Sequence, residues 1–295
     1  MIDWFTAPWD HTFMQHAFYA IVLVGIICGT TGAFVILRGL AFLGDALSHA
    51  IFPGVVISFI LGADFLIGAL IAAVIVSFLI GGVTQGGRLN NDTAIGVLFA
   101  GGFALGVAIM STQKSYTRDL NSFLFGSILS VTRQDLYLTA GIGVVVLATI
   151  FWFRREFTTI AFDRTFAKAS GLRLWAFDQL FLVILALAIV VSLQTVGNVL
   201  VLAMLVTPAA TARLLTDRLL RMMVGASVIG SLSGVAGLYV SYYEGVPSGA
   251  AVVLIETLVF GLVFLLNPST GMITSRVLRR MHLGHPERDS FSEPA

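Results

Sequence analysis

The sequence predicts an all-α, polytopic transmembrane bundle of about eight or nine spans. Of its 295 residues, 57% are hydrophobic and only 11% are charged, and the mean hydropathy is +0.95. A soluble domain carries about 25% charged residues, so a surface this poor in charge cannot face water. In lipid, helices satisfy their own backbone hydrogen bonds, which favours a helical bundle.

Apolar stretches of about 20 residues locate the expected spans. The stretches near 42–60 and 197–214 are the least regular, because each contains polar residues and a proline. Glycines four residues apart, such as Gly25 and Gly29, predict close helix packing. The nine candidate spans lie near 17–37, 42–60, 63–83, 93–112, 136–153, 178–194, 197–214, 222–243 and 249–266.

Basic residues indicate which side of the membrane faces the cytoplasm. They follow the first, third, fifth, seventh and last candidate spans, whereas the loops near 61–63, 195–197 and 244–248 contain neither Lys nor Arg. This alternation predicts an outer N-terminus and an inner C-terminus. Within the outer loop, the apolar run Leu120–Val131 is too short to span, and we expect a re-entrant or interfacial helix there.

Three regions are expected along the chain. Residues 1–16 contain Trp4, Trp9 and Pro8 and predict a short interfacial segment, because Trp favours the headgroup level. Residues 17–270 form the transmembrane domain. The polar residues 271–295 form a cytoplasmic tail.

Two ionisable side chains open the second candidate span. Asp45 and His49 are four residues apart, so a helix places both on one face. Ionisable groups in a span usually face a cavity and mark an ion pathway, and oxygen with imidazole suits Mn, Fe or Zn. The alternative is a structural hydrogen bond between the two side chains. A single pair supplies few ligands, whereas a two-fold dimer would bring two pairs together.

A third ionisable group, Glu256, lies in the middle of the last span. It is a candidate metal or proton site, but we favour an interhelical hydrogen bond. The segment 160–177 is amphipathic and basic. It predicts a short helix capped near Asp163 and ended near Gly171, lying flat at the cytoplasmic membrane face. Such a helix could dock on a cytosolic partner or serve only as a linker.

Several function classes find no support in the sequence. It contains no glycine-rich phosphate loop, no HExxH and no GxSxG motif, so we expect no enzyme activity in this chain. If ATP drives the protein, another subunit binds it. No basic patch suggests nucleic acid as a partner.

Five blocks of sequence resemble the permease subunits of manganese, zinc and iron uptake ABC transporters. The most specific is RGLAFLGDALSHAIFPGV, with its GD-x-x-SH-x-x-x-PG core, and the resemblance covers nearly the whole chain. The five blocks occupy residues 38–55, 91–99, 119–131, 163–172 and 194–219.

The resemblance implies the fold of a metal-type ABC importer permease in a bacterial inner membrane, with Asp45 and His49 as the metal-coordinating residues. It implies that Asp163, Phe166, Ala167 and Gly171 belong to the coupling helix that seats in the ATPase. The implied partners are two cytosolic ATPase subunits that bind the ATP, an external metal-binding protein and a second permease, identical or a sister chain. No permanently bound cofactor is implied.

We rank Mn first as the transported metal, then Zn and Fe, because the absence of a Cys ligand leans mildly toward Mn or Fe. The alternative function is a proton-coupled secondary metal transporter without an ATPase partner, which would use Glu256 or Asp45 as the proton carrier.

Overall fold

A computed structural model describes residues 6–85, 91–112 and 128–267, and every regular element in these ranges is a helix. Nine helical segments are long and apolar enough to cross a membrane within these ranges. The predicted helical bundle is therefore confirmed. The polar tail 271–295, and most of the outer loop with its expected re-entrant helix, lie outside the described residues.

The spans agree with the sequence prediction to within a few residues. The first begins at Thr12, inside the segment 1–16 that we expected at the membrane surface, after a short 3₁₀ turn η1. The elements are η1 (Ala7–Asp10), α2 (Thr12–Leu37), α3 (Leu43–Ala50), α4 (Phe52–Ile60), α5 (Phe65–Gln85), α6 (Asn91–Ser111), η2 (Ile128–Ser130), α8 (Arg133–Trp152), α9 (Arg154–Phe162), α10 (Arg164–Ala169), α11 (Leu174–Val196), α12 (Asn198–Leu215), α13 (Leu219–Glu244) and α14 (Ser248–Leu266).

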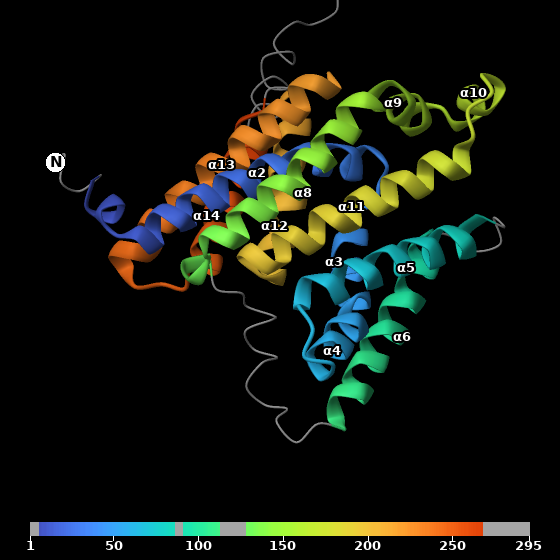
Figure 1. The fold of residues 1–295 in the computed structure, drawn as a ribbon. Helices are drawn as coiled ribbons and strands as arrows, with labels where there is room; N and C mark the ends of the chain where they lie inside the picture. The colour runs from blue at the N-terminus through green and yellow to red at the C-terminus, as the bar shows by residue number, and fades with distance from the viewer. Residues whose placement is uncertain (1–5, 86–90, 113–127, 268–295) are drawn as a thin grey trace, which may run out of the picture.

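Helix α2 is the central element of the bundle. In an apolar stretch of 18 residues in α2, 72% of the residues are buried inside the protein, compared with 17% in such a stretch of the peripheral α14. It packs against α8, α11, α12 and α13, while α3 to α6 gather on the other side of α11 (Figure 1). Helix α11 therefore joins two groups of spans, because α2 and α5 both pack on it.

Small residues allow the central helices to approach each other closely. A Cβ atom on Gly29 would lie 2.5 Å from the backbone nitrogen of Ser227 on α13. A Cβ atom on Gly32 would overlap the carbonyl oxygen of Leu205 on α12. Helices in lipid associate largely through such close packing, so these glycines hold α12 and α13 against α2.

The second span is interrupted in the middle, because α3 ends at Ala50, α4 begins at Phe52, and Ile51 lies between them. Pro53 lies in the first turn of α4 and has no N–H, so it cannot continue the hydrogen-bond ladder of α3. A tight turn joins α11 to α12 at Gly197, whose φ of 86° is a conformation that other residues rarely adopt. This turn places Asn198 at the start of α12.

We predict that Gly32→Ala lowers the free energy of unfolding by about 1–3 kcal/mol, because the added methyl group forces α12 away from α2. Thermal unfolding of the purified protein in detergent measures the effect. Gly96→Ala on α6 is the matched control, since a Cβ atom there has no neighbour within 4 Å. Equal stability of the two variants would contradict the predicted close approach.

Candidate functional site

Asp45 and His49 lie on one face of α3, as the sequence predicts. The Nε2 atom of His49 is 3.5 Å from Oδ1 of Asp45. The His49 side chain is 18% exposed and that of Asp45 is 40% exposed, so the carboxylate is the more accessible of the two. Both groups are thus able to meet a small ligand together, with the imidazole held deeper in the protein.

A third polar side chain reaches the same imidazole nitrogen. The amide Nδ2 of Asn198, at the start of α12, is 3.1 Å from Nε2 of His49. Asn198 is 5% exposed, and its Oδ1 atom and the Nδ1 atom of His49 have no hydrogen-bond partner among the described residues. The structure therefore brings together a carboxylate, an imidazole and an amide from two separate spans.

The sequence analysis did not single out Asn198. It is 149 residues from His49, so no local spacing connects the two. The one feature of the sequence that could have indicated Asn198 is its position after a glycine, at the start of the irregular span 197–214. Only the tight turn at Gly197 reveals which helix that amide faces.

Two aromatic rings from α6 hold the imidazole. Phe99 and Phe103 each lie 5.3 Å from His49 between ring centroids, with interplanar angles of 74° and 85°. Such edge-to-face contacts restrict the ring orientation and keep water from its faces. As a result, His49 presents its Nε2 atom toward Asp45 and Asn198.

These side chains offer oxygen and nitrogen atoms of the kind that bind borderline divalent cations. No group of three or more His, Cys, Asp or Glu residues that could hold a metal ion exists among the described residues. The side chains that meet here in one copy of the chain are the Asp45–His49 pair and the amide of Asn198. A complete coordination shell would need further donors.

Glu256 lies apart from this group. It is 1% exposed on α14, and neither carboxylate oxygen has a hydrogen-bond partner in the described part of the chain. The interhelical hydrogen bond that we favoured is therefore absent among the described residues. Helix α14 packs mainly on α12 and α13, whereas α3 packs on α6 and α11.

The segment 160–177 consists of three parts: the end of α9, the short helix α10 and the start of α11. Oδ1 of Asp163 accepts a hydrogen bond of 2.8 Å from the backbone N–H of Phe166, which confirms the expected cap. Gly171 has a φ of 80° and closes the turn after α10, also as expected. Ala167 is fully buried while Phe166 is 61% exposed, so α10 presents an aromatic ring to its surroundings.

In the described part of the chain, nine apolar helices with polar groups within them and a short helix between two of them are the features of a multi-pass membrane protein. The ABC 3 transport family matches residues 10–267, and the chain belongs to this family. It is thus the membrane subunit of a metal ABC transporter in the bacterial inner membrane, where ATP hydrolysis takes place in a separate subunit. The chain itself is not an enzyme.

Similarity to named relatives covers most of the chain. It is 46% identical to the manganese transport system membrane protein MntC of Halalkalibacterium halodurans, over 90% of this chain and 91% of the relative. It is 40% identical to the manganese import system permease protein ScaB of Streptococcus parasanguinis, over 87% of this chain and 91% of the relative.

Solved structures share the fold. The structure of PsaBC from Streptococcus pneumoniae in complex with Fab is similar with a TM-score of 0.81 and 37% sequence identity, over 95% of this chain and 100% of the other. A putative metal-chelate type ABC transporter in an inward-facing conformation shares the fold at 14% identity, with a TM-score of 0.68.

We predict that Asp163→Ala destabilises α10 by about 0.5–2 kcal/mol, because the Phe166 N–H loses its cap. Hydrogen exchange at residues 164–169 should become faster while exchange in the spans is unchanged. The matched control is Asp217→Ala, an aspartate whose side chain is 94% exposed and which pairs only with Arg213. Unchanged exchange in α10 would show that the cap contributes nothing to it.

Proposed function

We propose that this chain imports Mn²⁺ and that Asp45, His49 and Asn198 bind the ion during translocation. The observation that carries the proposal is the convergence of a carboxylate and an amide on one imidazole nitrogen from two different spans. The manganese relatives support Mn²⁺ as the first substrate. Zn²⁺ and Fe²⁺ rank behind it, because the same donor types also bind them.

Asp45 and His49 together compensate a cation for the hydration water that it loses on entering the site. The Asp45 carboxylate offsets the charge of the ion where the surroundings are apolar, and a neutral His49 supplies a lone pair. The amide oxygen of Asn198 is buried without a partner, so rotation of the side chain would add a further oxygen donor. Transport requires that such a site admit the ion without holding it permanently.

A second permease copy would complete the site. Mn²⁺ favours six oxygen or nitrogen ligands, and one copy offers three residues from the described part of the chain. A two-fold axis through the pathway would double this set. We propose that the partner is either an identical chain or a sister permease.

Cytosolic ATPase subunits are the proposed source of energy. The sequence has no phosphate-binding loop of its own, and α10 exposes Phe166 beside the buried Ala167. We propose that α10, bounded by Asp163 and Gly171, seats in a groove of the ATPase as a helix docks in a groove. An external binding protein would deliver the ion on the other side.

A proton-coupled transporter without an ATPase is the competing function. Family membership favours the ABC type. This alternative would use Glu256 or Asp45 as the proton carrier, and Glu256 belongs to no group of three or more His, Cys, Asp or Glu residues in the described part of the chain. Metal-dependent ATP hydrolysis by the purified complex would separate the two, since the alternative needs none.

Asp45→Ala and His49→Ala should each lower the initial rate of Mn²⁺ uptake by more than about tenfold, because each removes a proposed ligand. Uptake is measured in cells that lack other manganese importers, after checking that each variant reaches the membrane. His11→Ala, which changes an exposed histidine at the start of α2, is the control and should keep full uptake. Normal uptake by both site variants would refute the assignment.

Asn198→Leu should weaken Mn²⁺ binding by about 10–100-fold, because it removes both the amide oxygen and the group that orients His49. Binding of Mn²⁺ to the purified permease is followed by electron paramagnetic resonance. The control is Gln194→Leu, an amide near the same turn that donates to Asp135 and does not contact His49. If the two variants bind Mn²⁺ equally, Asn198 is not part of the site.

A further inference from the structure

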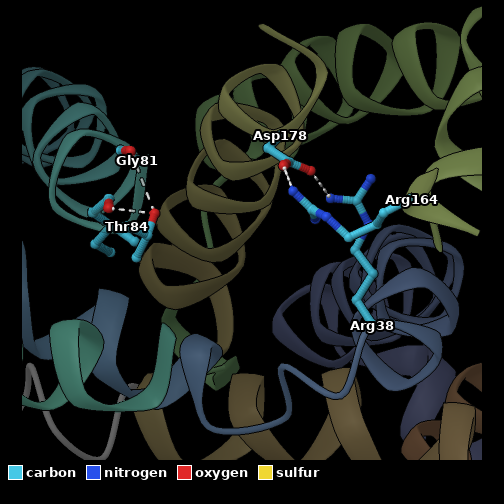
Figure 2. Close-up of polar contacts among 6 residues, drawn as sticks. Arg38, Gly81, Thr84, Arg164 and Asp178 are labelled. Atoms are coloured by element: carbon cyan, nitrogen blue, oxygen red, sulfur yellow. Dashed lines mark hydrogen bonds and ion pairs between the residues drawn. The ribbon is translucent and has the colours of Figure 1, made fainter. Parts of the chain in front are cut away.

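Three charged side chains meet where α2, α10 and α11 come together (Figure 2). Asp178, in the first turns of α11, accepts a hydrogen bond of 3.0 Å from Nη1 of Arg38 on one oxygen. Its other oxygen accepts a hydrogen bond of 2.7 Å from Nη2 of Arg164, the first residue of α10. A single carboxylate therefore joins the end of the central helix to the short helix between α9 and α11.

The two arginines lie in very different surroundings. The Arg38 side chain is 9% exposed, and its guanidinium lies 4.3 Å from the ring centroid of Phe181. Burial lowers the pKa of Arg38 below its usual value, and the nearby Asp178 carboxylate offsets part of this effect. The Arg164 side chain is 61% exposed. Arg38 thus anchors Asp178 in the core, whereas Arg164 adds little packing to it.

Arg38 also stands at the entrance to the helix that carries the candidate metal site. It ends α2, and the turn that follows contains Gly39 with a φ of 69°. Helix α3 then begins at Leu43, which is 1% exposed, and has Asp45 in its first turn. Since Leu43 is packed tightly, a shift of Arg38 would displace the start of α3 along with it.

The three charged residues form part of the wall of a cavity of about 820 Å³. Gly81 and Thr84 on α5 lie across from them (Figure 2). Because the interior of a protein is close-packed elsewhere, side chains beside such a space can move with few collisions. Asp178 therefore has room to shift when α10 moves.

We propose that Asp178 is a positioning residue that transmits movement of α10, through Arg164 and Arg38, to α3 and its metal-binding pair. The proposal rests on the function proposed above, in which α10 seats in an ATPase. A purely structural ion pair would need only Arg38 and Asp178. The exposed Arg164 binds the other oxygen of the same carboxylate, and an exposed ion pair of this kind can break and form again during a transport cycle.

The test uses the complete transporter, with its ATPase subunits, in sealed vesicles. Mn²⁺ uptake and ATP hydrolysis are measured in the same preparation, and their ratio gives the ions moved per ATP. Arg164→Gln should lower this ratio by about twofold to fivefold, as expected for loss of one exposed ion pair, while ATP hydrolysis continues. Arg164→Lys retains the charge and should restore most of the ratio.

Arg213→Gln is the matched control, because Arg213 is a partly exposed arginine near the end of α12 that pairs with Asp217, just beyond that helix, instead of Asp178. It should leave the ratio unchanged. In an Asp178→Asn background, Arg164→Gln should cause no further loss, since the connection is already broken.

Two results would overturn the proposal. In the first, Arg164→Gln leaves the number of Mn²⁺ ions moved per ATP unchanged and only lowers the amount of complex that is recovered. This result would mean that the ion pair has a structural role alone. The other is a full additional loss when Arg164→Gln is combined with Asp178→Asn. Failure of the function proposed above is distinguishable, because the unmodified complex would then show no Mn²⁺ uptake or no associated ATPase, and the proposal for Asp178 would fall with it.

Discussion

The arrangement of this protein depends on the cost of leaving a polar group without a partner in an apolar medium. A buried charge or imidazole is stabilised by partners within the protein, because lipid offers none, although Glu256 has no hydrogen-bond partner among the described residues. His49 finds Asp45 and Asn198, and Arg38 finds Asp178 and the ring of Phe181. These contacts decide which faces of α3, α11 and α12 turn inward, and the apolar residues pack around them.

Close packing of α2 makes those contacts possible. Glycines on α2 bring α12 and α13 within van der Waals distance, and α12 in turn carries Asn198 to α3. Arg38 follows directly after the last residue of α2, and its carboxylate partner lies on α11. One central helix therefore supports both the candidate metal site and the connection to α10. A change in how α2 packs would reach both regions.

The sequence predicted the spans and the Asp45–His49 pair well, because both are local features. An apolar stretch of about 20 residues marks a span, and two residues four apart share a helix face. The cap at Asp163 and the turn at Gly171 were also found, since each depends on neighbouring residues. The hydrogen bond expected for Glu256 is not formed among the described residues, because the sequence does not show which side chains of the neighbouring helices face it.

The sequence by itself determined a multi-pass helical bundle, its spans and the placement of an acid and an imidazole on one side of α3. Hydropathy and helical periodicity act over a few turns, so they can be read without the fold. Only the tertiary structure decided that Asn198 joins His49 and that Asp178 joins Arg38 to Arg164. The first two of these contacts join residues 149 and 140 positions apart, and the direction of each side chain depends on how whole helices pack.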